Sequence, residues 1–231
     1  MSCSSDLNSE LVKFTWEQLS TEIPTGDQVK EVSNICNTLD TLDLLTSYTP
    51  SEIIGSNGNL SYRYGDEGSF VVTATQLPSK KGLNSSDFAI IDRYEFAEND
   101  TTASKAFYHG LKLPSSESIL HWYYYSKYPQ VNAIIHVHEI TDLLYSPKSR
   151  KRWRDLGIVE TSRYGDAGTI DLPLTIEEVL KNLNNYVILK NHYPDWDKEH
   201  TGTVVFAKNL QEAFYHMSSI HQKLLAINEN E

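Results

Sequence analysis

Two histidines at the end of an apolar run are the clearest chemical feature of this chain. His136 and His138 fall within the segment Asn132-Ala-Ile-Ile-His-Val-His-Glu139, which is rich in β-branched residues. In a β-strand, residues two positions apart project from the same face, so both imidazoles would point to one side. Neutral imidazole is a common zinc ligand, and a catalytic zinc site typically has three protein ligands and one open position. The pair therefore indicates either part of a metal site or two ordinary polar residues at a strand end.

Two further histidines could complete such a site, and both lie in one later segment. His192 directly ends the apolar run Tyr186-Val-Ile-Leu-Lys-Asn-His192, and His200 follows in the next stretch of chain. Strand-end placement favours His192, but both histidines remain candidates on the sequence alone. The remaining four histidines are expected to be ordinary structural or surface residues: His109, His121, His216 and His221.

Hydroxyl, amide and backbone N–H groups in two other segments favour a site for an anion. Ser115 and Ser116 begin a predicted helix, where free backbone N–H groups and the helix dipole favour a phosphate or carboxylate. The segment Gly58-Asn-Leu-Ser61 begins a predicted strand and could supply further donors. Glu117 follows the serine pair and could move a proton beside a metal. Their structural alternatives are a capped helix, a loop glycine and a favourable first-turn charge.

The elements that must position these side chains form an α/β order. Helical spacing of apolar residues predicts helices, and β-rich runs between turn residues predict strands. The order favours an α/β domain over residues 25–231, with helices flanking a mostly antiparallel sheet, after an N-terminal extension (residues 1–24) with a short helix. The predicted helices are 11–19, 25–45, 115–128, 176–183 and 210–227, and the predicted strands are 59–64, 69–75, 88–94, 131–138, 186–191 and 203–207.

Composition limits the classes of partner. The chain has 231 residues and a formal net charge of −11, which argues against binding nucleic acid or an anionic membrane through bulk electrostatics. A small anionic ligand remains possible because local donors can dominate one pocket. The chain has no apolar stretch of transmembrane length, no signal-like N-terminus and only two cysteines, Cys3 and Cys36. We therefore expect a cytoplasmic protein in a reducing setting.

Six motifs occur in an order that resembles the class II aldolase/adducin family, and the resemblance spans about residues 32–217. It implies a single three-layer α/β/α domain around a central, mostly antiparallel sheet. It also implies a divalent metal, usually zinc, held by three histidines, and a homotetramer with active sites near subunit interfaces. The motifs are Gly58-Asn-Leu-Ser-Tyr-Arg63, Phe70-Val-Val-Thr-Ala-Thr-Gln76, Leu83-Asn-Ser-Ser-Asp-Phe88, Pro114-Ser-Ser-Glu117, Asn132-Ala-Ile-Ile-His-Val-His138 and Leu189-Lys-Asn-His192.

The resemblance implies a role for each candidate residue. His136 and His138 match the paired metal ligands and His192 matches the third, although His200-Thr-Gly202 could also align with the family's His-Gly. Glu117 matches the family's acid/base carboxylate. The positions that match residues binding the substrate phosphate are Asn59, Thr75, Ser115 and Ser116.

The chain also departs from the family pattern. Family members usually have a glycine after the position of Thr75, where this chain has Gln76. They commonly have a glycine after the third histidine, where this chain has Tyr193. The segment Pro194–Gly202 is an insertion relative to the family pattern. The tyrosine acid of the family's aldolases has no clear counterpart, and Tyr145 and Tyr164 are its possible substitutes.

These features favour a metal-dependent, aldolase-type lyase. The expected substrate is a small, phosphorylated, sugar-like hydroxy-carbonyl compound that reacts through a metal-stabilised enediolate. A dehydratase or 4-epimerase acting on a sugar phosphate is the alternative with the same site. The third hypothesis is a non-catalytic, adducin-like interaction domain. Loss of the metal histidines would indicate such a domain. This chain retains histidine at all three positions, which argues against it. The expected partners are the small substrate and other copies of this chain, with no nucleic acid or membrane.

Overall fold

The computed structural model describes residues 12–47, 54–65, 68–97, 100–183, 185–193 and 197–228. Within these residues, nine strands form one sheet in the order β1-β5-β4-β3-β2-β6-β9-β8-β7. The two outermost pairs, β1 with β5 and β7 with β8, are parallel, and the other pairs are antiparallel. The strands are β1 (Thr15–Ser20), β2 (Asn59–Arg63), β3 (Phe70–Thr73), β4 (Phe88–Ala97), β5 (Asp100–His109), β6 (Ala133–Ile140), β7 (Ile158–Glu160), β8 (Tyr186–Ile188) and β9 (His200–Ala207).

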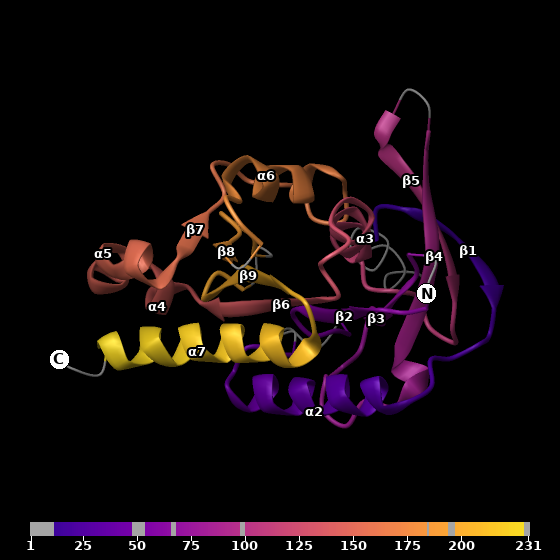
Figure 1. Cartoon of the computed structure of the whole chain (residues 1–231), viewed down its shortest axis with the longest axis horizontal. Helices are drawn as coiled ribbons and strands as arrows, with labels where there is room; N and C mark the ends of the chain where they lie inside the picture. The colour runs from indigo at the N-terminus through magenta and orange to yellow at the C-terminus, as the bar shows by residue number, and fades with distance from the viewer. Residues whose placement is uncertain are drawn as a thin grey trace, which may run out of the picture.

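Helices cover both faces of this sheet, which makes three layers (Figure 1). One face packs against α2 (Asp27–Thr41) and α7 (Leu210–Asn228), with α4 (Thr141–Tyr145) and α5 (Pro147–Leu156) at the end of that layer. The other face packs against α3 (Ser118–Lys127) and α6 (Asp171–Val179). A short 3-10 helix, η1 (Ser85–Asp87), precedes β4. The predicted α/β/α arrangement with a mostly antiparallel sheet is therefore confirmed.

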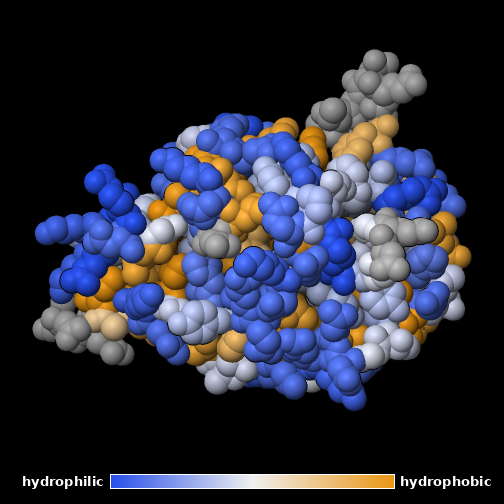
Figure 2. Space-filling model, viewed as in Figure 1, coloured by the Kyte–Doolittle hydropathy of each residue, from blue (hydrophilic) through white to orange (hydrophobic). Residues whose placement is uncertain are grey.

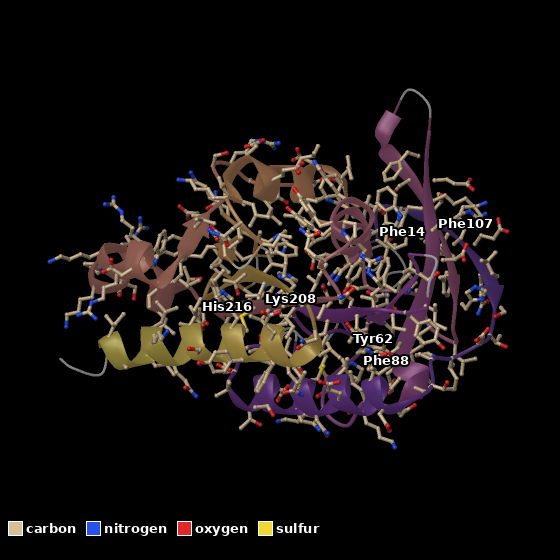
Figure 3. The ribbon with its side chains drawn as sticks, viewed as in Figure 1. Phe14, Tyr62, Phe88, Phe107, Lys208 and His216 are labelled. Atoms are coloured by element: carbon tan, nitrogen blue, oxygen red, sulfur yellow. The ribbon has the colours of Figure 1, made fainter. Side chains whose placement is uncertain are left out.

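The sheet separates two hydrophobic cores because side chains alternate along each strand. Tyr62 and Phe88 belong to the core beneath α2, whereas Phe14 belongs to the core beside α3, and Figure 3 shows them on opposite sides of the sheet. In β6, Ile135 and Val137 enter the first core. The alternate residues of β6, including both histidines, therefore face the layer that contains α3.

The predicted helix over residues 11–19 was wrong within the described residues. Thr15–Ser20 form the edge strand β1, which pairs with β5 from Thr15↔Lys105 onward, and all six residues are exposed. Apolar residues spaced as in a helix produced the wrong assignment. Backbone pairing with the open edge of β5 outweighs that weak local preference, because strand formation depends strongly on tertiary context.

Other elements were correctly typed but differ in extent, and some were not predicted. The predicted helix 115–128 begins only at Ser118, and the predicted helix 176–183 occupies Asp171–Val179 instead. Strands β5 and β7 and helices α4 and α5 were not predicted. The largest omission is β5, which pairs with β4 along most of its length and forms the long hairpin at the upper right of Figure 1.

The visible surface is mainly polar. Figure 2 shows a largely hydrophilic face, with strongly hydrophilic side chains over α5, where the sequence reads Pro147-Lys-Ser-Arg-Lys-Arg-Trp-Arg-Asp-Leu156. No helix in the described part of the chain is long and apolar enough to cross a membrane.

Candidate metal centre and adjoining cavity

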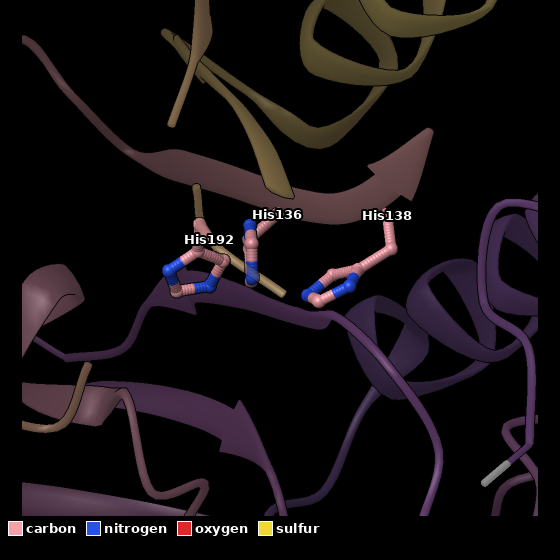
Figure 4. A group of neighbouring side chains, drawn as sticks. All are labelled: His136, His138 and His192. Carbon is pink, nitrogen blue, oxygen red and sulfur yellow. The ribbon is translucent and has the colours of Figure 1, made fainter. Parts of the chain in front are cut away.

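Two histidines of β6 and one from the turn after β8 lie together in the layer beside α3. One nitrogen from each of His136, His138 and His192 lies within 4.8 Å of the other two. The ring centroids are 5.2 Å apart for His136–His138, 5.1 Å for His136–His192 and 5.4 Å for His138–His192. Figure 4 shows all three rings on one side of β6. The strand period of two therefore places the His-Val-His pair as the sequence predicted.

Backbone contacts fix the orientation of His136. Its Nδ1 lies 2.8 Å from the carbonyl oxygen of Thr203 on β9. A carbonyl oxygen only accepts hydrogen bonds, so Nδ1 carries the hydrogen and Nε2 keeps its lone pair. Metal-binding histidines commonly donate their second ring N–H in this way, which fixes both tautomer and ring orientation.

His192 reaches the other two rings through a tight turn after β8. Leu189 N–H donates to the Gly202 carbonyl oxygen (2.8 Å), and Gly202 N–H donates to the His192 carbonyl oxygen (2.9 Å). A Cβ atom placed on Gly202 would lie 2.2 Å from His192 Cδ2 and 3.0 Å from His136 Cε1. The absence of a side chain at Gly202 is therefore what leaves room for the His192 ring.

Gly202→Ala is expected to displace the His192 ring, because a 2.2 Å contact is impossible and must be relieved by movement. Zinc affinity should fall by at least about tenfold, and overpacking should lower the free energy of unfolding by about 1–3 kcal/mol. Competition with a fluorescent zinc chelator measures the affinity. Gly82→Ala is the control for zinc affinity, since a Cβ at Gly82 meets no atom within 4 Å, although the φ of 65° at Gly82 gives this variant a stability cost of its own. Equal zinc affinity in the wild type and Gly202→Ala would contradict this account of His192.

Glu117 lies against two of the histidines. Its Oε2 is 3.1 Å from His136 Nε2, and its Oε1 is 2.9 Å from His192 Nε2. The carboxylate is buried at the N-terminal boundary of α3, where Glu117 is the N-cap residue. Burial raises the pKa of this carboxyl, but the adjacent His136 and His192 imidazoles outweigh burial and hold the pKa well below its usual range. The residue predicted to be the acid/base is therefore brought beside the predicted metal ligands.

His121 supports the Glu117 carboxylate through Asn59. It is completely buried, and burial, with the nearby His136 ring as the second cause, lowers its pKa to about 3. A neutral ring has one donor and one acceptor nitrogen. His121 Nε2 contacts Asn59 Oδ1, which only accepts, so Nε2 carries the hydrogen and Nδ1 is the acceptor.

A hydrogen-bond chain of fixed direction follows from this tautomer. The Tyr125 hydroxyl donates to Ser61 Oγ (2.7 Å), and Ser61 donates to His121 Nδ1 (2.6 Å). His121 then donates to Asn59 Oδ1, which leaves Asn59 Nδ2 to donate to Glu117 Oε2 (2.9 Å). The chain orients the Asn59 amide and anchors one oxygen of the carboxylate. The sequence contained a signal for this role, because His121 lies one helical turn after Glu117.

The donor atoms of this cluster fit a transition metal. Among the described residues, His136 Nε2, His138 Nδ1 and Glu117 Oε1 are buried without a hydrogen bond, and His136 Nε2 and Glu117 Oε1 have only the imidazole–carboxylate contacts given above. Buried polar atoms without a hydrogen bond are rare in proteins, and binding of an ion is one recognised explanation. Burial and the neighbouring His136 and His192 rings lower the pKa of His138 well below its ordinary value, so its ring is neutral. Three imidazoles are a donor set suited to zinc and related ions.

A cavity of about 190 Å³ adjoins the histidines. Ser115 and Thr75 are held in its wall by backbone pairing, since Ser115 N–H donates to Thr73 O (3.1 Å) and Thr75 N–H donates to Leu113 O (3.0 Å). Ser115 is buried, whereas Ser116 and Thr75 are half-buried. All four residues predicted to bind phosphate line this cavity with the acid/base candidate and two of the histidines: Asn59, Thr75, Ser115, Ser116, Glu117, His138 and His192.

Gln76 has an unusual backbone conformation where the sequence comparison expects glycine. Its φ is 57°, in the left-handed region that glycine enters without steric cost, and its side chain lines the cavity. Residue 76 therefore has the backbone conformation of a glycine and also carries a side chain. Gln76 adds an amide to the wall that the predicted phosphate-binding residues form.

The left-handed backbone at residue 76 predicts a stability difference between two substitutions. Gln76→Gly is expected to unfold with a free energy about 1 kcal/mol higher than Gln76→Ala, because alanine bears the steric cost of positive φ. Urea denaturation of the two variants measures the difference. Glycine loses more chain entropy on folding, which would make it the less stable variant at an ordinary position. An alanine variant as stable as the glycine variant would contradict the assigned backbone conformation.

The structure separates the remaining alternatives from the sequence. His200 stands outside the histidine cluster: it lies opposite Ile140 at the far end of β9, and its Nδ1 contacts Asp197 Oδ1 at 3.0 Å. Tyr164 lines the cavity, whereas the Tyr145 hydroxyl donates to Glu160. Within the inserted segment, residues 194–196 lie outside the described residues.

Two cavity contacts were not predicted. Asp197, in the described part of the inserted segment, accepts a hydrogen bond from Asn57 Nδ2 (2.9 Å), and so this segment braces the cavity wall. Lys80 lines the cavity as a buried lysine. No local pattern distinguishes Lys80 from its exposed neighbour Lys81, because its burial depends on residues far away in the sequence.

Comparison with known proteins agrees with this geometry. A sequence profile of the Class II Aldolase and Adducin N-terminal domain matches residues 47–224. The chain belongs to the class II aldolase/adducin family. The match spans every predicted site residue and most of the sheet.

Individual members of the family are distant relatives. The chain is 27% identical to an L-fuculose phosphate aldolase from Methanocaldococcus jannaschii over 193 residues, which is 78% of this chain and 90% of the relative. The structure resembles that of an L-fuculose 1-phosphate aldolase with a TM-score of 0.58 and 21% identity, over 90% of each chain. It also resembles a sugar-phosphate aldolase from Thermotoga maritima with a TM-score of 0.63 and 17% identity, over 88% of this chain and 94% of the other. The structural matches support the class II aldolase fold.

Proposed function

We propose that this protein is a metal-dependent lyase of the aldolase type that acts on a small, phosphorylated hydroxy-carbonyl compound. The observation that carries the proposal is the convergence of His136, His138 and His192 beside the buried Glu117 carboxylate. The adjoining cavity contributes the hydroxyl and amide groups of Thr75, Ser115, Ser116 and Asn59. The names of the aldolase relatives support the same reaction class.

Each part of the site has a distinct role in this proposal. The three histidines would hold a divalent ion, and we propose zinc because all three ligands are imidazoles. When bound, that ion would act as a Lewis acid on the substrate carbonyl. Glu117 receives or returns a proton at the carbon beside the carbonyl, and the hydrogen-bond chain through Asn59 keeps its Oε2 oriented. Thr75, Ser115 and Ser116 donate hydrogen bonds to the substrate phosphate.

In the direction of carbon–carbon bond formation, the aldehyde oxygen needs a proton as the bond forms, and we propose that Tyr164 donates it; in cleavage the hydroxyl proton of the leaving fragment returns to Tyr164. Its hydroxyl donates to Asp166 Oδ1 at 3.3 Å, and its side chain lines the cavity. Burial raises the pKa of Tyr164, which keeps the phenol protonated. We do not propose Tyr145 for this role because, unlike Tyr164, it does not line the cavity.

A panel of ketose 1-phosphates, including L-fuculose 1-phosphate, tests the proposed reaction. The zinc-loaded protein is expected to release an aldehyde from at least one member of the panel, as measured by a coupled reductase assay. Loss of water without carbon–carbon cleavage would assign a dehydratase instead, and inversion of one hydroxyl would assign a 4-epimerase. A zinc-free protein after purification and reconstitution would support the non-catalytic interaction domain and overturn the proposal.

We also propose a homotetramer in the cytoplasm, following the family resemblance. Light scattering during size-exclusion chromatography tests the assembly. A monomer at micromolar concentration would contradict it.

A further inference from the structure

Lys80 is a buried cation in the wall of the cavity. Only 2% of its surface is exposed. Its Nζ donates three hydrogen bonds, to Ser56 O (2.8 Å), Ser56 Oγ (2.9 Å) and Asn57 O (3.0 Å). All three acceptors are uncharged oxygens. Burying an ammonium group is costly unless an opposite charge compensates it, so this position needs a reason.

The surrounding carboxylates offset only part of that cost, because burial outweighs them and leaves the pKa of Lys80 lowered. Within the described residues, no ion pair includes Lys80. The titratable groups that face its ammonium are Cys36 and Asp40 of α2 and Glu117. Asp40 is bound at 2.7 Å by the exposed Lys81, and Glu117 contacts the histidines. Burial raises the pKa of the Cys36 thiol to about 12, so it stays uncharged.

The same ammonium lies in the wall that the predicted phosphate-binding residues form. Lys80 lines the cavity with Asn59, Thr75, Ser115 and Ser116. The other lysine in the lining, Lys13, is exposed and is paired with Asp166. Lys80 also fixes the carbonyls of Ser56 and Asn57, which immediately precede Gly58 and Asn59. Lys80 therefore places a positive charge at the cavity and also holds the turn that positions Asn59.

We propose that Lys80 is a positioning and specificity-determining residue that makes this cavity selective for an anionic group, such as a substrate phosphate. The inference rests on the proposed function for the substrate class. Because its three hydrogens are already used, Lys80 acts through its positive charge at short range and through the Ser56–Asn59 turn. Charges interact more strongly across a buried wall than across water, so one ammonium that is only partly compensated has a large effect there. A neutral group would gain nothing from it.

Sulfate binding tests the charge role without requiring a known substrate. Sulfate keeps the same charge over the neutral and alkaline range, and titration calorimetry on chelator-treated protein separates the cavity from any metal. Lys80→Met is expected to bind sulfate at least about tenfold more weakly than the wild type. Lys30→Met is the control, because it removes the same charge from an exposed lysine that lies outside the cavity and is paired with the exposed Asp27, and its sulfate affinity should equal that of the wild type. Equal affinities in the wild type and Lys80→Met would overturn the proposal.

The pH profile of sulfate binding gives a readout that a purely structural lysine would not move. Burial lowers the pKa of Lys80 to about 8. Wild-type sulfate affinity should therefore fall as the pH rises through about 8, whereas Lys80→Arg, which stays charged, should show no such fall. A flat wild-type profile would overturn the proposal even if Lys80→Met fails to fold. Zinc content is measured separately, so a failed metal site and a failed anion site give different results.

Discussion

His136→Ala is expected to bind zinc more than about a hundredfold more weakly than the wild type and to lose all metal-dependent activity. His136 is a central member of the cluster, and its Nε2 faces Glu117 while Thr203 holds its Nδ1. Loss of a hydrogen-bond partner behind a metal ligand already costs about 10–100-fold in affinity, and loss of the ligand itself must cost more. Elemental analysis after dialysis against a weak chelator measures the retained zinc.

His200→Ala is the matched control for that experiment. His200 is also a partly buried histidine of the same sheet, and it was the competing candidate for the third ligand, but its ring contacts Asp197 outside the cluster. Its alanine variant is expected to retain zinc. Full zinc retention by His136→Ala, or loss of zinc from His200→Ala alone, would contradict the assigned ligand set.

Glu117→Gln is expected to lower the turnover rate by about 10²–10⁴-fold while zinc content stays unchanged. The amide is nearly the same size and shape as the carboxylate but cannot accept and return a proton. Its oxygen can still accept the hydrogen bond from Asn59, so the chain through His121 survives. Initial rates at saturating substrate, taken on the panel member with the fastest aldehyde release, measure the effect.

The exposed Glu199 provides the control for this substitution. Glu199→Gln makes the same chemical change away from the cavity and should leave the rate within experimental error of the wild type. A Glu117→Gln protein with wild-type turnover would remove Glu117 from proton transfer. A variant that also lost its zinc would instead assign the carboxylate to metal binding.

Local patterns predicted the parts of the site that depend on one element. His136 and His138 share a face because they are two residues apart in β6, and Ser115, Ser116 and Glu117 lie together at the start of α3. Periodicity along the chain also predicted α2, α3 and α7, part of α6, and most of the strands. Motif order added the resemblance to the family, which the sequence profile then confirmed.

The rest depended on contacts between distant residues. The sequence alone left two candidates for the third histidine of the cluster. His192 joins the cluster because its ring fits against Gly202, and this contact cannot be predicted from a local pattern. β1 was missed because its backbone partners lie on β5, about ninety residues away. The charge of the cavity was missed for a similar reason: Lys80 and Lys81 are adjacent in sequence, and only the folded chain buries one and exposes the other.

Anomalous diffraction at the zinc edge, from crystals of the protein grown with zinc, tests the central claim most directly. One strong peak is expected at about 2.0–2.1 Å from a nitrogen of each of His136, His138 and His192, with a coordination position open toward the cavity. A histidine cluster without a peak would contradict the account. A peak bound through His200 in place of His192 would also contradict it.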